Sequence, residues 1–145
     1  MRTYLLAVVG LALTCQAAGA TGNPPAADLA VNATGLGSAE GEVRVALYDS
    51  KAGFEGKQPP FRTATAKGAE ARAQVVFRGL PPGDYAIALY HDRNGNGKLD
   101  RSFLGKPLEP YGFSNNARGT RGAPDFEKVR FTLPAAGASL EIRVR

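Results

Sequence analysis

The sequence predicts an all-β fold, an antiparallel sandwich of about seven strands with one long ordered loop. In several short segments apolar residues alternate with polar ones, which is the pattern of strands with one buried face. Glycine- and proline-rich turn signals separate these segments, and no window has the apolar stripe of an amphipathic helix. Short strands between such turns are typical of antiparallel sandwiches. The expected strands cover residues 29–34, 43–48, 61–66, 74–78, 85–91, 128–133 and 140–145.

The first twenty residues are predicted to be a secretory signal peptide. An apolar stretch from Tyr4 to Leu13 follows a basic N-terminus, and it is shorter than the roughly 20 residues that a membrane-spanning helix needs. Ala18-x-Ala20 then fits a signal peptidase site. We therefore expect residues 21–145 to form one periplasmic or secreted domain without a transmembrane span.

Cys15, the only cysteine, leaves a second interpretation of the N-terminus open. A bacterial lipoprotein signal ends in a cysteine that carries the lipid and becomes the new N-terminus. Thr14 is a weak match to the small residue expected before that cysteine, so a lipid anchor at Cys15 is the less favoured alternative. Cleavage after Ala20 would leave a chain without cysteine, which its core and not a disulfide must hold together.

The charge pattern argues against nucleic acid as a partner. The chain has 18 basic and 13 acidic residues and a formal net charge of +5. Its lysines and arginines are scattered along the sequence, whereas nucleic-acid binding needs a basic stripe or cluster. The partner expected for an exported domain is an envelope protein or a ligand.

The strand pattern stops between residues 101 and 124. This segment is rich in glycine, proline and asparagine, and a loop of that length inside a compact domain is usually functional or disordered. Its apolar residues argue against disorder, because an apolar-studded loop folds back on its own scaffold. These residues are Phe103, Leu104, Leu108, Tyr111 and Phe113.

Residues 92–100 fit the first nine positions of a calcium loop of the EF-hand type. Acidic and amide side chains occupy positions 1, 3 and 5, and Gly97 occupies the sharp turn at position 6. Position 12, where such loops have a bidentate glutamate, is Phe103, and Glu109 is the nearest replacement. The expected ligands of a weak calcium site are Asp92, Asn94, Asn96, the carbonyl of Lys98, Asp100 and Glu109.

The same residues also favour an ordinary tight turn. Asn, Asp and Gly adopt left-handed φ angles and form Asx turns, so Asp92 and Asn94 could simply accept hydrogen bonds from backbone amides. Few ligand charges and the nearby Arg93, Lys98 and Arg101 predict a weak calcium affinity, about 10⁻⁴–10⁻³ M. From the sequence, both interpretations stay open.

His91, the only histidine, carries the one enzyme hypothesis. It could act as a general base beside Asp92, Asp100 or Glu109 in a hydrolase-type site. Its parity with Ile87 and Leu89 instead favours a hydrogen-bonded histidine at the end of an inward-facing row. Ser114 lacks the G-x-S-x-G context of a nucleophile elbow. We expect no catalytic residues.

Four stretches resemble a bacterial secreted family known as domain of unknown function 2141. They are GEVRVALYDS (41–50), Phe54 in a short loop, the long segment from Gly79 to Ala117 that contains LPPGDY and HDRNGNGKLD, and FEKVRFTL (126–133). The resemblance implies a periplasmic or secreted β-sandwich of transthyretin-like or immunoglobulin-like type. It also implies that residues 91–100 and 107–115 belong together. No activity is established for that family.

The sequence thus suggests an exported, non-enzymatic binding or interaction module. In this hypothesis calcium in the 92–100 loop orders the 101–124 loop, which presents Tyr111, Phe113 and Asn115 to an envelope protein or ligand. The alternative is a purely structural envelope module without metal. An enzyme that uses His91 is the less favoured third hypothesis.

Overall fold

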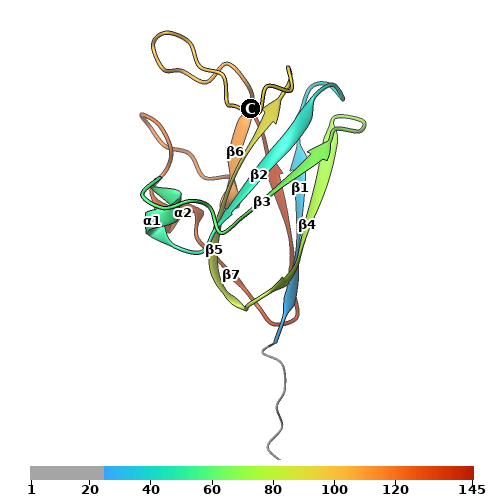
Figure 1. Ribbon diagram of the computed structural model, residues 1–145, viewed down its shortest axis with the longest axis vertical. Helices are drawn as coiled ribbons and strands as arrows, with labels where there is room; N and C mark the ends of the chain where they lie inside the picture. Colours follow the sequence, from blue (N-terminus) through green and yellow to red (C-terminus); the bar gives the residue numbers. More distant parts are fainter. Residues whose placement is uncertain (1–24) are drawn as a thin grey trace, which may run out of the picture.

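Residues 25–145 form a two-layer β-sandwich in the computed structural model, which describes these residues and not 1–24 (Figure 1). One layer is a three-stranded sheet in the order β4-β1-β8. The other is a five-stranded sheet in the order β3-β2-β5-β6, with β7 also paired to β5. The predicted all-β sandwich is confirmed. The predicted signal peptide, its cleavage site and Cys15 lie outside the described residues.

The described chain contains eight strands and three very short helices, and the helices are single turns. The elements are β1 (Ala27–Thr34), β2 (Glu42–Tyr48), α1 (Lys51–Phe54), β3 (Arg62–Lys67), β4 (Arg72–Leu80), β5 (Gly83–Asp92), β6 (Tyr111–Phe113), η1 (Ser114–Asn116), α2 (Phe126–Val129), β7 (Phe131–Leu133) and β8 (Ala138–Arg143). In the part of the chain that the structure describes, no helix is long and apolar enough to cross a membrane.

The core lies between the two sheets and is built from the inward rows that the alternation predicts. In β2, the side chains of Val43, Val45 and Leu47 are at most 2% exposed, while Arg44 and Ala46 between them face outward. Burying each aliphatic side chain of this size contributes about 1.5–3 kcal/mol. The inward row of β5 consists of Tyr85, Ile87, Leu89 and His91.

Two elements differ from the predicted strands. β6 is an eighth strand inside the segment predicted to be a loop, and it pairs with Ala88–Tyr90 of β5. The strand expected at 128–133 is shorter, because residues 126–129 form α2 instead. Phe126 and Val129 are three residues apart, so one helical turn puts both side chains on the same face.

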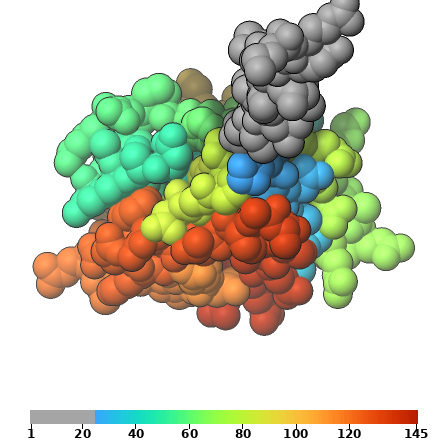
Figure 2. Space-filling model, turned by 90° about the horizontal axis from the view of Figure 1, so that it is seen from below, coloured from blue at the N-terminus to red at the C-terminus, as the bar shows by residue number. Residues whose placement is uncertain are grey.

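One strand pair is parallel. β1 pairs with β4 in the antiparallel sense and with β8 in the parallel sense, from Leu29 opposite Ala138 to Thr34 opposite Arg143. The other strand pairs among the described residues are antiparallel. Seen from the end where β1 begins, the start of β1 lies against the C-terminal segment (Figure 2).

A second, smaller core covers part of the outer face of the five-stranded sheet. Phe126 and Val129 of α2 bury Ala86 there, and Phe54 of α1 packs edge-on against Phe113 with ring centroids 5.9 Å apart. Both views show α1 and the segment around 114–125 on the same side of the sandwich (Figures 1 and 2). The two helices cover the part of this sheet face around Ala86. The part of the same face around Ala46 and Ala88 is not covered by them.

A candidate ligand-binding cleft

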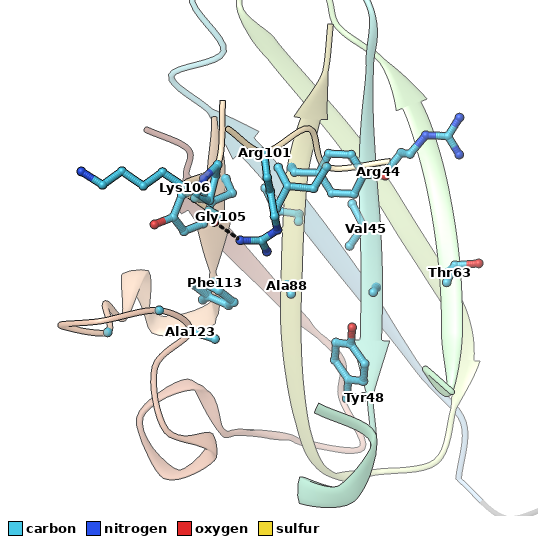
Figure 3. A pocket seen from close by; sticks show the side chains of 18 of the residues that line it. Arg44, Val45, Tyr48, Thr63, Ala88, Arg101, Gly105, Lys106, Phe113 and Ala123 are labelled. Carbon is cyan, nitrogen blue, oxygen red and sulfur yellow. Dashed lines mark hydrogen bonds between the residues drawn. The ribbon is translucent and has the colours of Figure 1, made fainter. Parts of the chain in front are cut away.

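The uncovered half of the outer sheet face is the floor of a cleft of about 830 Å³ (Figure 3). Its floor comes from four adjacent strands, β3, β2, β5 and β6. Two loop segments form its rims, residues 97–107 on one side and residues 119–123 on the other. A volume of several hundred cubic ångströms is the size of sites that hold small molecules.

The floor combines small and aromatic side chains. Ala46 and Ala88 lie opposite each other on β2 and β5 and line the cleft. Their side chains are small, so they leave space at the centre of the floor. Aromatic rings surround this space, and Tyr111 meets Phe113 edge-on with ring centroids 5.8 Å apart. Burial raises the pKa of the Tyr48 and Tyr90 phenols, so both stay neutral hydrogen-bond donors near neutral pH. The aromatic lining residues are Tyr48, Tyr90, Tyr111 and Phe113.

The first rim is a hairpin held by its own hydrogen bonds. Arg101 and Pro107 form an antiparallel bridge, and the amide of Gly105 donates to the carbonyl of Ser102 at 2.8 Å. The guanidinium of Arg101 donates to the Gly105 carbonyl at 3.0 Å (Figure 3, dashed line). Arg101 therefore lies on the inner side of the hairpin, whereas Lys106 extends away from the floor in the same view.

The second rim depends on a close backbone approach. A Cβ atom at Gly119 would overlap the carbonyl oxygen of Gly122 and lie 2.7 Å from that of Ala123. Real Cβ atoms do not come that close to backbone oxygens, so the turn at 119–123 needs glycine at this position. Thr120 and Arg121 at its tip also line the cleft.

The cleft is lined by cations and by no acidic residue. Four basic residues line it: Arg44, Arg101, Lys106 and Arg121. Arg44 forms ion pairs with Asp92 at 2.8 Å and with Glu42 at 3.4 Å. The hydrogen bond from Arg44 to Asp92 raises the pKa of Arg44 further, so this residue is a permanent cation. Within residues 25–145 the other three form no ion pair, and their charges are available to a ligand.

The 92–100 loop lies at the edge of the cleft, where Gly97 and Leu99 reach its lining. The fully buried carboxylate of Asp92 accepts the backbone N–H groups of Asn96 at 3.1 Å and Gly97 at 2.8 Å. Burial opposes its ionisation most strongly, but hydrogen bonds from the Gly97 amide, the Arg44 guanidinium and the Gly95 amide, with the charge of Arg44, lower its pKa overall. Asp92 is therefore an ionised anchor for the loop.

The other residues of the predicted calcium site also take part in this hydrogen-bond network. The side-chain amides of Asn94 and Asn96 donate to the carboxylate of Asp100 at 2.6 and 2.9 Å. The carboxylate of Glu109, 7% exposed, accepts the backbone N–H groups of Arg93 at 2.8 Å and Asp100 at 3.2 Å. The structure thus brings the loop and Glu109 together, as the residue pattern predicts.

This geometry is that of an Asx-stabilised turn. The oxygens of Asp92 and Glu109 face N–H donors, and among residues 25–145 no three acidic, histidine or cysteine side chains are grouped as metal ligands. The amide of Lys98 donates to Asn96 Oδ1 at 2.9 Å, which adds another turn of the same kind. Calcium binding by these residues stays a prediction.

His91 lies on the opposite face of β5 from the cleft. Its side chain is fully buried in the core, as its parity predicts. Nδ1 lies 3.1 Å from the carbonyl oxygen of Leu36, and Nε2 lies 2.6 Å from that of Glu40. Both ring nitrogens are thus engaged by backbone, and the imidazole fixes the 36–40 loop against β5.

The three predicted partner-binding residues do not all lie at the cleft. Tyr111 and Phe113 line the cleft, but Asn115 does not. The Asn115 side chain donates to the carbonyls of Lys128 and Arg130 at 3.1 and 2.9 Å, so it joins η1 to the α2–β7 segment. Its neighbour Ser114 is fully buried and donates to the Val129 carbonyl at 2.5 Å. Asn115 is a structural residue here.

The basic residues of the cleft were not predicted from the sequence to form a site. Arg44 carries a usable signal, because its position between Val43 and Val45 places it on the outward face of a strand. Arg101, Lys106 and Arg121 carry no such signal, since they lie in loops whose course depends on contacts with distant strands. Their convergence becomes visible only in the folded chain.

Comparisons with known proteins place the chain in a family and assign no activity. Residues 31–141 match a family described as an uncharacterized protein conserved in bacteria, domain of unknown function 2141. No curated protein shows a significant match. Among solved structures, a pilus-presented adhesin (Cpa), determined as a cysteine-to-alanine mutant, aligns with 13% identity and a TM-score of 0.31. The alignment covers 83% of this chain and 27% of the adhesin chain.

Proposed function

We propose that this chain, which belongs to the uncharacterized bacterial family of domain of unknown function 2141, is an exported, non-enzymatic binding module. Its ligand site is the cleft on the outer face of the five-stranded sheet. The observation that carries this proposal is a cleft of about 830 Å³ with an aromatic floor, four cations and no acidic residue in its lining.

The lining chemistry selects a ligand with an anionic group and an apolar body. An arginine guanidinium binds carboxylate, phosphate or sulfonate groups through two N–H donors at once. Arg101 and Arg121 lie on opposite rims, so an anion near the mouth of the cleft contacts a cation on either side. The rings of Tyr111 and Phe113 offer flat apolar surfaces to the rest of the ligand.

Two observations support a binding role over a catalytic one. The residues that line the cleft include no aspartate, glutamate, histidine or cysteine, so neither a carboxylate nor an imidazole is present there as a general base. His91 is buried on the other side of the sheet, with both ring nitrogens against carbonyl oxygens. A purely structural role is the remaining alternative, and it requires that the cleft bind nothing.

Calcium binding at the 92–100 loop is a second candidate property. What favours it is that the side chains of Asn94 and Asn96 lie within hydrogen-bond distance of the Asp100 carboxylate, next to Glu109; calcium would have to replace the two amide N–H donors there. Calcium at ten times its Kd would raise the free energy of unfolding by about 1.4 kcal/mol. The test is urea unfolding of the wild type and of Asp100→Ala with EDTA and with millimolar calcium. A calcium effect in the wild type alone supports the site, and no effect removes it.

Two fluorescent probes that differ in charge test whether the cleft prefers an anionic ligand. Anilinonaphthalene sulfonate combines an aromatic body with one negative charge, and phenylnaphthylamine has the same kind of body without the charge. The proposal predicts that the protein binds the anionic probe more tightly than the neutral one. Arg121→Gln is expected to weaken anionic-probe binding several-fold and to leave neutral-probe binding unchanged.

Matched variants identify the site. Arg72→Gln removes an exposed arginine from β4 in the other sheet and should change neither affinity. Phe113→Ala should weaken both probes, because it removes part of the floor. Equal binding of the two probes, or equal effects of Arg121→Gln and Arg72→Gln, would contradict the proposal.

A further inference from the structure

The hairpin at the rim of the cleft exposes an apolar tip, which we define as Phe103, Leu104 and Leu108. Their exposed fractions are 96%, 69% and 64%, the three highest values of any large apolar residue in the described chain. The other exposed large apolar residues are Phe61 at 40% and Val76 at 39%. An exposed apolar group of this kind on one projecting loop marks an interaction site.

Local hydrogen bonds fix the hairpin that carries this tip. The amide of Ser102 donates to the Lys106 carbonyl at 2.8 Å, and the amide of Lys106 donates to Ser102 Oγ at 3.2 Å. The amide of Leu108 donates to the Asp100 carbonyl at 2.8 Å. Phe103 and Leu104 lie at the turn of this hairpin, so their side chains are held outward instead of collapsing onto the sandwich.

Positive charge surrounds the apolar tip. Between residues 101 and 108 the hairpin contains Arg101 and Lys106 and no acidic residue. The exposed Arg93 and Lys98 belong to the adjacent 92–100 loop, which Glu109 joins to the base of the hairpin. The Glu109 carboxylate itself is buried and bonded to two backbone amides. Asp100 at the base of the hairpin is half-buried, so one carboxylate stands against these four cations and the charge beside the tip is net positive.

We propose that this tip docks the protein on an anionic lipid surface. Apolar side chains enter the boundary between headgroups and acyl chains, while flanking lysines and arginines stay at the level of the anionic headgroups. Each cation near such a surface strengthens binding by about fivefold. The hydrogen bonds within the hairpin satisfy backbone groups that would otherwise enter the lipid unpaired.

The shape of the tip favours a lipid surface over a protein partner. The hairpin projects from one end of the sandwich as a narrow loop (Figure 1). A stable protein interface buries about 800 Å² on each partner, which a single turn does not provide. This surface adjoins the cleft: Phe103 and Leu108 lie outside the cleft lining, whereas Leu104 belongs to both.

The chain contains no tryptophan, so a single introduced indole reports the position of the tip. The experiment uses the full chain with Phe103→Trp and, as its matched control, Phe61→Trp. Each is mixed with vesicles of phosphatidylcholine and with vesicles that also contain phosphatidylglycerol. With anionic vesicles, the emission of Phe103→Trp is expected to shift to shorter wavelength and to be quenched by lipids brominated on their acyl chains. Neutral vesicles and the Phe61→Trp control should give neither change.

A charge variant tests the second half of the proposal. Lys106→Gln in the Phe103→Trp background is expected to weaken partitioning into anionic vesicles about fivefold, and Lys57→Gln, which follows α1 at the opposite end of the sandwich, is expected to leave it unchanged. Equal losses in these two variants overturn the electrostatic part of the proposal.

Four outcomes overturn the docking itself. They are no shift with anionic vesicles, an equal shift with neutral vesicles, an equal shift in Phe61→Trp, or a shift that grows with protein concentration without vesicles. The last outcome would mean that a second copy of the chain covers the tip. The Phe61→Trp control carries the same N-terminal apolar stretch, so a shift and quenching confined to Phe103→Trp assign the lipid contact to the tip.

Discussion

Replacing Asp92 with alanine is expected to lower the free energy of unfolding by about 3 kcal/mol. The buried carboxylate accepts two backbone N–H groups of the 92–100 loop, those of Asn96 and Gly97 at 3.1 and 2.8 Å. A hydrogen bond to a charged group contributes about 1.5–3 kcal/mol. The lower figure applies to each of these two bonds, because the loop that is released in the variant can turn its amides to water, and two bonds at about 1.5 kcal/mol give the expected loss of about 3 kcal/mol. Since a domain of this size is stable by about 5–15 kcal/mol, the loss is readily measured.

The assay is urea unfolding in the presence of EDTA. Asp28→Ala is the matched control, because Asp28 is also an aspartate that accepts a backbone amide, that of Gly79 at 3.0 Å, but with a side chain 52% exposed. The control should lose no more than about 1 kcal/mol. A loss in Asp92→Ala no larger than that in Asp28→Ala would contradict the role given to the buried carboxylate. That role is also contradicted if EDTA alone lowers the wild type to the stability of Asp92→Ala, because a metal and not the N–H donors would then hold the loop.

Three further predictions concern pH, the core and the second rim. Because the pKa of Asp92 is lowered in the folded state, its contribution to the free energy of unfolding is complete above the ordinary carboxylate pKa near 4. That contribution is lost as the pH falls through the lower pKa of the folded state. Asp92→Asn should flatten the plot of unfolding free energy against pH in this range. Leu47→Ala, at a fully buried position, should cost about 2–5 kcal/mol in urea unfolding, and a smaller loss would mean that the inward row of β2 is wrongly placed. Gly119→Ala should weaken anilinonaphthalene sulfonate binding and also lower the unfolding midpoint, because the added Cβ overlaps the Gly122 carbonyl oxygen and the turn must shift; unchanged probe binding would contradict the role of this rim.

Local pattern accounts for most of the fold. Strand alternation depends only on neighbours in sequence, so the alternation alone assigns Val43, Val45 and Leu47 to a buried face, where all three lie. The same reasoning correctly places His91 in the core. The Asx chemistry of residues 92–100 also predicts that Asp92 and Asn94 accept backbone amides, and both do.

Long-range pairing accounts for what the sequence did not predict. β6 is only three residues long, and Tyr111–Phe113 becomes a strand because β5 offers it an edge. The parallel pairing of β1 with β8 joins residues more than a hundred positions apart, and no local signal specifies it. The cleft has the same origin, because its cations come from a strand and two separate loops.

The most direct test of the proposed binding site is a nuclear magnetic resonance titration of the protein with anilinonaphthalene sulfonate, followed through the backbone amides of glycines. Gly97, Gly105, Gly119 and Gly122 line the cleft, whereas Gly56, Gly79 and Gly137 do not. If the ligand binds in the cleft, the four cleft amides shift together with one dissociation constant and the other three stay in place. Shifts centred on the three-stranded sheet, or no saturable shift at the cleft glycines, would contradict the proposed binding site.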